Sequence, residues 1–278
     1  MAVSCPALYL SHKKMNKIKS LIFDMDGVLW RDQTPIGDLG KIFQNLQHHN
    51  IKFAFATNNS TKSPSEYQNK LHRFGIEVKE EQIITSATTL VELLKEKYPD
   101  GGPVHILGEN GLREALQQNG FHHSDRNVLA VVGGLDRQIN YEKLKIATLL
   151  LQQEVDFYYT NADTTFPTPE GIIPGAGSIL RALEVGSGRN AILAGKPKPI
   201  MFEIAMKTIK ASRESTLVIG DRLDTDILGG LEAKCFTALV LTGISTSEDL
   251  KNSAYQPYFV FENLSNLVDN LFHNNWEI

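Results

Sequence analysis

The feature that most constrains this chain is a short apolar run that ends in two aspartates, set two residues apart. Residues 21–29 read LIFDMDGVL, and residues 21–23 have the pattern of a buried strand. Side chains two apart on a strand point the same way, so Asp24 and Asp26 can face one site at the strand's carboxyl edge, where open parallel α/β sheets place ligands. Gly27 allows the backbone to turn sharply afterwards. The pair suits a cation with oxygen ligands or a nucleophile beside an acid, and the plainer alternative is a solvated turn.

Composition narrows the classes of protein that this chain can belong to. It has 278 residues, 42% hydrophobic and 22% charged, which is typical of a globular protein of two domains, or of one domain with a large insertion. The net charge of -4 gives no sign of a nucleic acid polymer as partner, and no apolar run reaches the roughly 20 residues that span a membrane. The two cysteines, Cys5 and Cys235, make no disulfide framework, which predicts a reducing, cytoplasmic location. Cys235 lies in an apolar stretch and is expected to be a core residue.

The beginning and the end of the chain alternate predicted strands and helices. A strand at 20–25 precedes a helix near 37–49, and a strand at 51–56 precedes a helix that begins at Pro64. Strands at 191–194, 217–219 and 237–241 resume this pattern nearer the C-terminus. Strand and helix in alternation are typical of a parallel sheet. The sequence therefore predicts an α/β fold with a Rossmann-like parallel-sheet core.

The middle of the chain has an alternation of its own, with strands predicted at 104–107, 129–133 and 157–160. A glycine- and proline-rich stretch at 167–177 reads as a loop, and Gly186-Ser187-Gly188 as a linker. These strands could extend the first sheet, but the glycines and the motif spacing favour an inserted module. We expect a core of residues 17–85 and 189–278, an inserted α/β cap domain at 86–188, and an N-terminal extension at 1–16.

Two further motifs could hold an anion, and each follows a predicted strand. Thr57-Asn58-Asn59-Ser60 offers hydroxyl, amide and backbone N–H groups, although the same residue types serve in ordinary turns. The segment 195–199 reads GKPKP, and a lysine there can neutralise a phosphate as a point charge. Lys196 and Lys198 compete for that role, and we favour Lys196 because it lies nearer the end of the strand.

A last motif, GDRLDTDI at 220–227, places three aspartates after an apolar strand. Such a group again fits a cation with oxygen ligands. Asp224 could instead cap the following helix, and Asp226 would suit the first turn of that helix. Asp221 is the hardest of the three to explain by structure alone, since it follows a turning glycine at the strand end.

Together these motifs resemble the four motifs of haloacid dehalogenase-like phosphatases, and the long insert resembles the type IIA cap of that family, the branch that includes nitrophenylphosphatases and phosphoglycolate phosphatases. Within the insert, residues 160–163 (TNAD) and 174–178 (PGAGS) are similar to that branch as well. The resemblance covers about residues 17–270. It departs at 35–38, where this chain has PIGD and many members have PIPG.

The resemblance implies a role for each motif. Asp24 would be the nucleophile that forms an aspartyl-phosphate, and Asp26 the acid and base. Mg²⁺ would bind to Asp24, to the backbone carbonyl of Asp26 and to Asp221. The remaining groups are the phosphate ligands Thr57, Asn58, Asn59 and Lys196, and Asp226, which would orient Lys196 or a metal-bound water. Within the cap, candidates for contact with the leaving group are Asn161, Asp163 and Thr165, unless they form an ordinary turn.

The implied activity is Mg²⁺-dependent hydrolysis of a small phosphorylated metabolite. Phosphoglycolate, sugar phosphates, nucleoside monophosphates, pyridoxal phosphate and nitrophenyl phosphate all remain open as substrates. Alternatives are a phosphonate-cleaving relative, a carbon–halogen hydrolase, against which Asp26 argues, and a non-catalytic binding protein on the same fold. A homodimer through the cap is a further expectation, and neither a nucleic acid polymer nor a membrane is expected as partner.

Overall fold

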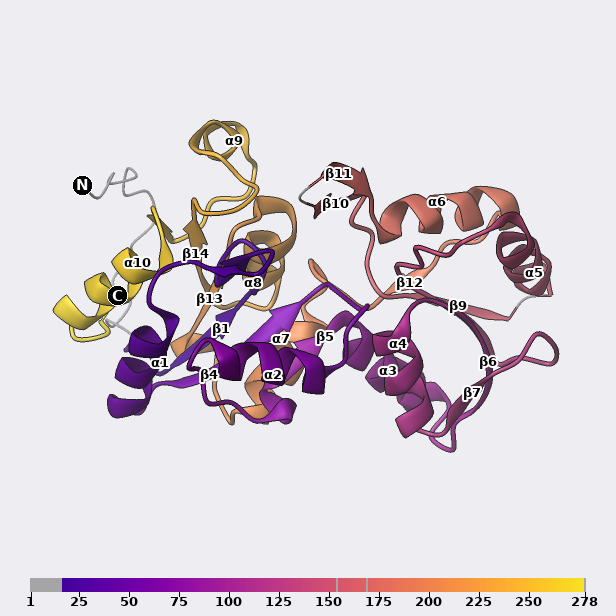
Figure 1. The fold of residues 1–278 in the computed structure, drawn as a ribbon, viewed down its shortest axis with the longest axis horizontal. Coiled ribbons are helices and arrows are strands. Elements are labelled where there is room, and N and C mark those ends of the chain that lie inside the picture. The colour runs from indigo at the N-terminus through magenta and orange to yellow at the C-terminus, as the bar shows by residue number, and fades with distance from the viewer. Residues whose placement is uncertain (1–16, 154, 169, 278) are drawn as a thin grey trace. The chain divides into compact units, whose positions relative to one another are not determined.

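The computed structural model describes residues 17–153, 155–168 and 170–277 (Figure 1). The predicted N-terminal extension, which includes Cys5, lies outside the described residues. The described residues divide into two compact units, of which the first comprises residues 17–56, 68–83 and 202–277 and the second lies within residues 57–67 and 84–201. This division assigns the Thr57 motif to the second unit, whereas the predicted cap begins at residue 86.

The first unit is built on a six-stranded sheet in the order β15-β14-β13-β1-β4-β5. The strands are β1 (Ser20–Phe23), β4 (Lys52–Thr57), β5 (Ile83–Thr85), β13 (Thr216–Gly220), β14 (Phe236–Val240) and β15 (Phe259–Phe261). The ladders of β1 with β13 and β4, and of β14 with β13 and β15, are parallel, as the sequence predicts. Because β1 and β13 are neighbours, Asp24 and Asp221 follow adjacent strand ends at the carboxyl edge of this sheet.

Helices and short turns fill the chain between these strands. The helices are α1 (Leu39–His48), α2 (Pro64–Arg73), α7 (Ile200–Thr208), α8 (Leu228–Glu232), α9 (Ser247–Asn252) and α10 (Leu264–His273). A short hairpin, β2 (Trp30–Arg31) with β3 (Thr34–Pro35), follows β1, and short turns lie at η1 (Glu80–Gln82), η2 (Arg213–Ser215) and the π-helical η3 (Leu223–Ile227). Among the described residues, no helix combines the length and apolar composition needed to cross a bilayer.

The core of the first unit follows from the apolar pattern of its elements. Helix α1 buries Leu39, Ile42, Phe43 and Leu46, which recur at helical spacing on one face. The Phe43 ring lies 5.1 Å from the ring of Phe23 on β1, so α1 packs on the central strand of the sheet. Burial stabilises this unit mainly by removing apolar area from water.

The second unit has a separate parallel sheet of five strands, in the order β12-β9-β8-β6-β7. Its strands are β6 (Gly102–Leu107), β7 (Phe121–His123), β8 (Ala130–Gly133), β9 (Asp156–Tyr159) and β12 (Ile192–Leu193). The three strands predicted in the middle of the chain all lie in this sheet and none in the sheet of β1. One prediction was wrong: the strand near 191–194 does not return to the first sheet, because Ile192 and Leu193 pair with Tyr158 and Tyr159 of β9.

Four helices cover the two faces of this second sheet (Figure 1). They are α3 (Ser86–Lys97), α4 (Asn110–Gln118), α5 (Tyr141–Leu151) and α6 (Ala176–Ser187). Val104 and Ile106 of β6 pack with α3 and α4, whereas Val131 of β8 and Phe157 of β9 pack with α5 and α6. Alternate strand residues point to opposite faces, so both faces carry apolar side chains and the unit is a three-layer α/β/α structure.

Two segments that the sequence assigned to loops are regular structure instead. Helix α6 continues through Gly186 and Ser187, and Gly188 at φ 71° ends it, so residues 186–188 form a helix end and no linker. The Ser187 hydroxyl donates to the Leu183 carbonyl at 2.7 Å, which satisfies one acceptor of the last turn. The stretch 167–177 contributes to an antiparallel hairpin of β10 (Thr165–Thr168) and β11 (Gly171–Pro174).

Cys235 is a buried core residue, as the sequence predicts. Burial raises the pKa of its thiol to about 12, which keeps the sulfur protonated at neutral pH. A protonated, buried thiol is a poor nucleophile, so Cys235 has a packing role.

Candidate active site

Three aspartates of the first unit gather where β1 and β13 end, and we call them the acidic group: Asp24, Asp221 and Asp226. Ligand oxygens of the three side chains all lie within 4.8 Å of one another. The backbone N–H of Asp24 donates to the Ile219 carbonyl at 2.8 Å, which continues the pairing of β1 with β13 up to the group. Asp221 and Asp226 are buried. The structure thus brings together three of the predicted site residues.

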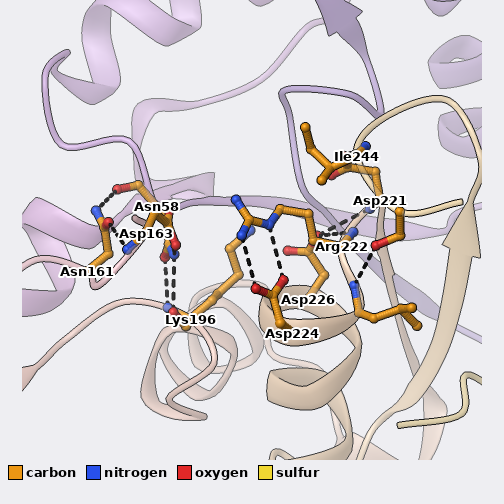
Figure 2. A network of polar contacts seen from close by, with 11 residues as sticks. Asn58, Asn161, Asp163, Lys196, Asp221, Arg222, Asp224, Asp226 and Ile244 are labelled. Atoms are coloured by element: carbon orange, nitrogen blue, oxygen red, sulfur yellow. Dashed lines mark hydrogen bonds and ion pairs between the residues drawn. The ribbon is translucent and has the colours of Figure 1, made fainter. Parts of the chain in front are cut away.

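The loop that follows β14 fixes the side chain of Asp221. Its Oδ2 accepts the backbone N–H of Ile244 at 2.7 Å (Figure 2), and its own carbonyl accepts the N–H of Ser245 at 3.0 Å. A Cβ at Gly243 would lie 1.8 Å from this Oδ2, so the loop approaches the carboxylate as closely as only glycine permits. Sequence reasoning missed this loop. The available signal was a Thr-Gly pair directly after the predicted strand at 237–241.

Asp226 anchors the backbone that carries Asp221. One of its oxygens, Oδ2, accepts the N–H groups of Asp221 at 3.2 Å and of Arg222 at 3.1 Å (Figure 2). The π-helical turn η3 holds Asp226 in this place. Asp224 does not cap the helix, because its exposed carboxylate instead accepts from the Arg222 guanidinium at 3.2 and 3.0 Å.

The acidic group has the chemistry of a site for a hard divalent cation. Carboxylate oxygens are the ligands that Mg²⁺ prefers, and three carboxylates this close repel one another unless a cation or a proton neutralises them. The side chain of Asp26 is not in the group: it is exposed and accepts the indole N–H of Trp30 at 2.8 Å. Gly27 has φ 87°, so it makes the sharp turn that the sequence predicts between Asp26 and the following hairpin.

A second set of possible metal ligands lies in the second unit: His105, His123 and Asp125. Asp125 Oδ1 lies 2.9 Å from His105 Nδ1 and 3.3 Å from His123 Nε2. However, the backbone N–H of Ile106 donates to His123 Nδ1 at 3.1 Å, and this requires a lone pair on Nδ1. Neutral His123 then carries its proton on Nε2, the nitrogen that faces Asp125. That tautomer offers no lone pair to a metal there, so we do not assign a metal site to these residues.

The second unit contains the other predicted site residues, centred on the side chain of Asn58. Its Oδ1 accepts the backbone N–H of Lys196 at 2.8 Å, and its Nδ2 donates to the Lys196 carbonyl at 3.1 Å. The same Nδ2 donates to both carboxylate oxygens of Asp163 at 3.2 Å (Figure 2). Asn58 therefore joins the Thr57 loop to the Lys196 loop, although 138 residues separate the two partners.

Asn161 completes this arrangement. Its Nδ2 donates to the Asn58 carbonyl at 2.7 Å, and its Oδ1 accepts the backbone N–H of Asp163 at 3.1 Å (Figure 2). The Ser86 hydroxyl donates to the same Asn58 carbonyl at 2.6 Å. Asn161 and Asp163 thus support the Asn58 loop, whereas Thr165 lies exposed at the start of β10. Contacts of these three residues with a substrate stay predictions.

The remaining phosphate candidates lie in the same two loops. Thr57 is buried, and its hydroxyl oxygen accepts the backbone N–H of Asn59 at 3.1 Å. Asn59 Oδ1 accepts the N–H of Thr61 at 2.9 Å, so this side chain shapes the turn. Lys196 is buried, with 4% of its surface exposed, whereas Lys198 is exposed as most lysines are. The difference supports the choice of Lys196 over Lys198.

Comparisons with known proteins show which family this chain is similar to. The family model of haloacid dehalogenase-like hydrolases matches residues 21–122, and a second model, of HAD-hydrolase-like proteins, matches residues 193–267. The chain is 34% identical to an acid sugar phosphatase of Staphylococcus haemolyticus, over 94% of this chain and 99% of that protein. It is 36% identical to a dihydroxyacetone phosphatase of Corynebacterium glutamicum, over 90% of each chain.

A solved structure shows the same fold. A 4-nitrophenylphosphatase from Thermotoga maritima superimposes with a TM-score of 0.86 at 33% identity, over 91% of this chain and 97% of that one. The matches to the curated relatives extend over nearly their full length, so they include both the segments that carry the acidic group and those that carry Asn58 and Lys196. The chain therefore belongs to the haloacid dehalogenase-like hydrolases, among their type IIA capped phosphatases.

Proposed function

We propose that this protein is a Mg²⁺-dependent phosphomonoester hydrolase that acts through an aspartyl-phosphate on Asp24. The observation that carries the proposal is the acidic group, in which Asp24 lies with the buried Asp221, at the end of the neighbouring strand, and with the buried Asp226 of η3. The family that the comparisons give agrees with this chemistry. A non-catalytic protein on the same fold would have no need of three carboxylates held so close together, since their mutual repulsion costs stability.

The proposed reaction has two steps. A carboxylate oxygen of Asp24 attacks phosphorus, the bond from phosphorus to the ester oxygen breaks, and Asp26 gives its proton to that leaving oxygen. Asp26, now a carboxylate, takes a proton from a water molecule, which attacks the aspartyl-phosphate and releases inorganic phosphate. Asp24 is then regenerated as a carboxylate and Asp26 as an acid.

Residues of the second unit would stabilise the phosphoryl oxygens. Lys196 supplies positive charge, and the Thr57 hydroxyl and the N–H groups of the turn at Asn58 and Asn59 supply donors. The side chain of Asn58 has a different task in this proposal, because its amide already binds the backbone of Lys196 at both ends. It keeps the lysine loop and the threonine loop in register.

The metal would be held by Asp24, the backbone carbonyl of Asp26 and Asp221. When bound there, Mg²⁺ would neutralise negative charge on the phosphoryl group and on the nucleophile. Asp226 keeps Asp221 in place through the backbone N–H groups that it accepts. Supporting contacts of this kind are worth about 10–100-fold in metal affinity in known sites.

For the substrate, we propose a small phosphorylated metabolite, with sugar phosphates and triose phosphates to be tested first. This choice follows the names of the two relatives that are 34% and 36% identical to the chain. Phosphoglycolate, nucleoside monophosphates and pyridoxal phosphate complete the panel, and nitrophenyl phosphate is a convenient reporter. The exposed side chain of Thr165 and the rest of its hairpin are the candidates for contact with the leaving group.

Two further proposals concern the setting of the enzyme. We place it in the cytoplasm, because the chain has only two cysteines and Cys235 is buried with a protonated thiol. We also propose a homodimer through the second unit, where Tyr141 and Leu149 of α5 and Val185 of α6 are exposed apolar side chains. Light scattering on the purified protein would give the mass, and a strict monomer would contradict the dimer.

The test of the proposed activity is release of phosphate from the panel with Mg²⁺ and after exhaustive chelation. We expect turnover that depends on Mg²⁺ and that is abolished in Asp24→Asn, whose amide is a poor nucleophile and carries no charge. A circular dichroism spectrum like that of the wild type would show that this variant is folded. Release from no member of the panel, or wild-type release by Asp24→Asn, would contradict the proposal.

A further inference from the structure

An indole N–H of the first unit binds the carboxylate of Asp26. Trp30 Nε1 donates to Asp26 Oδ1 at 2.8 Å, a normal hydrogen-bond distance. Trp30 is fully buried, whereas Asp26 is exposed. The donor is therefore a buried indole N–H, and the acceptor is an exposed carboxylate. The two residues are only four positions apart. A backbone hydrogen bond stabilises the turn between them, because the N–H of Gly27 donates to the Trp30 carbonyl at 2.8 Å.

A buried lysine holds the indole ring. Lys70 Nζ lies 4.0 Å from the centre of the Trp30 ring, and it donates to the Asp32 carbonyl at 2.6 Å. Lysine is rarely buried, yet only 6% of the surface of Lys70 is exposed. A cation is attracted to the face of an indole ring, most strongly where both are desolvated, and its charge also polarises the ring so that the N–H is a better donor. Trp30 is thus fixed from two sides, by its own turn and by Lys70 of α2.

The chemistry of the indole favours one of the two oxygens of Asp26 as the site of a proton. An indole N–H is a donor only, so the oxygen that it binds must present a lone pair. Oδ1 is that oxygen. In a neutral carboxyl group the carbonyl oxygen is a better acceptor than the hydroxyl oxygen, so the contact favours the form with the proton on Oδ2. A carboxyl group without this contact could place its proton on either oxygen and could rotate.

We propose that Trp30 is a positioning residue for proton transfer by Asp26: it binds Oδ1 so that the transferable proton sits on Oδ2. This inference rests on the proposed role of Asp26 as the acid and base. The same contact would leave Oδ2 as the oxygen that takes the proton from water in the second step. Lys70 acts on the reaction only through Trp30.

The first test compares Trp30→Phe with Trp276→Phe, which replace the two tryptophans of the chain. Phenylalanine keeps an aromatic ring at residue 30 and removes the N–H. Trp276 is a matched control, because it is also buried and its Nε1 has no hydrogen-bond partner among the described residues. The kcat/KM of each variant is measured for nitrophenyl phosphate, a good leaving group, and for an alkyl phosphate, a poor one that needs protonation.

We expect Trp30→Phe to lower kcat/KM for the alkyl ester by about 10-fold or more and for nitrophenyl phosphate by much less, because positioned acids act on the ester oxygen. Trp276→Phe should change both esters equally or not at all. An equal loss on both esters in Trp30→Phe, or the same selective loss in Trp276→Phe, would overturn the positioning role. If the wild type hydrolyses neither ester, it is the proposed function that fails.

The second test needs no activity and no change at Trp30. With two tryptophans, the protein gives two indole N–H signals in a ¹⁵N spectrum, and Trp276→Phe removes one and so assigns the other to Trp30. Replacement of the carboxylate in Asp26→Asn should shift the Trp30 signal and leave that of Trp276 in place. An unchanged Trp30 signal would show that the indole is not bonded to Asp26, and the proposal would then be wrong even if phosphatase activity is present.

Discussion

The amide of Asn58 donates to both carboxylate oxygens of Asp163, at 3.2 Å each. The two residues come from loops that are 105 positions apart, and hydrogen bonds with a charged partner contribute about 1.5–3 kcal/mol. Asp163 therefore helps to hold the side chain that binds the backbone of Lys196. Its first role in the structure is to support the proposed phosphate site.

Asp163→Ala should consequently raise KM by about 10-fold for every phosphate ester alike, because Asn58 loses a charged partner. Steady-state kinetics over the substrate panel would measure this. The control is Thr165→Ala, which removes an exposed side chain with no hydrogen bond to Asn58 among the described residues and which should change some esters more than others. A change in selectivity without a general loss in Asp163→Ala would instead favour contact with the leaving group.

Gly243→Ala should weaken Mg²⁺ binding. A Cβ there would lie 1.8 Å from Asp221 Oδ2, so the loop or the carboxylate has to move. We expect the Mg²⁺ concentration for half-maximal activity to rise by about 10-fold or more, in line with the loss of other supporting contacts. Gly40→Ala on α1 is the control, since its nearest neighbour would be an ordinary 3.5 Å away. An unchanged Mg²⁺ titration in Gly243→Ala would argue against Asp221 as a ligand.

Ca²⁺ should inhibit the enzyme in competition with Mg²⁺. Mg²⁺ demands octahedral geometry, whereas Ca²⁺ takes 6–8 oxygen ligands at longer distances. The larger ion can draw a second oxygen of Asp24 into its coordination shell, and the nucleophile is then lost. Phosphate release at fixed Mg²⁺ with increasing Ca²⁺ would show inhibition that excess Mg²⁺ relieves. Full activity with Ca²⁺ alone would contradict this account of Asp24.

Acid should destabilise the protein through His105. Burial lowers the pKa of His105 below its usual 6.5, with the neighbouring His123 as a second cause, and burial lowers the pKa of His123 as well. Below pH 6.5 the unfolded chain takes up protons that the folded protein does not, so the free energy of unfolding falls as the pH drops from 6.5 toward the lowered pKa values. Well above pH 6.5 these groups are neutral in both states and contribute no pH dependence.

Chemical denaturation at pH 7.5 and pH 5.5 would measure this effect. His105→Gln should reduce the loss of stability between the two pH values, because it removes a group whose pKa is lower in the folded protein than in the unfolded chain. His122→Gln, which changes an exposed neighbour, should leave the loss as large as in the wild type. An equal loss in the His105 variant would mean that other groups control acid stability.

The sequence predicted the parallel sheet and the strand ends at which the candidate site residues lie, because both depend on local patterns. A buried strand followed by glycine and aspartate can be recognised from a few neighbouring residues. The preference for Lys196 over Lys198 as the candidate phosphate ligand also rests on local sequence, because Lys196 lies nearer the end of a strand. The loop at Gly243 was missed, because its role comes from a contact with Asp221 and not from its own side chain. The same holds for Trp30, because its indole N–H becomes relevant to the site only through the turn that brings it to Asp26.

The errors in the fold have a related cause. Residues 186–188 (GSG) have the composition of a linker, yet packing of the preceding apolar residues extends α6 through Ser187. The strand at 192–193 is short, and its sequence pattern does not indicate which sheet it joins. Its pairing with β9 is a contact between residues far apart in the sequence. Residues 167–177 were assigned to a loop because they are rich in glycine and proline, although Pro167 and Pro174 both lie within the hairpin.

The hydrogen bonds of Asn161 and Asp163 to the Asn58 loop have a consequence for changing the specificity of this enzyme. A library that varies these two positions to accept new leaving groups would also loosen Asn58 and, through it, Lys196. Gains in selectivity at these two positions would be offset by weaker catalysis. Variants that accept a new leaving group would then be discarded because the Asn58 loop is loosened. The hairpin of β10 and β11 makes a better target, since Thr165 and Ile172 are exposed and, within the part of the chain that the structure describes, their side chains make no hydrogen bond to Asn58.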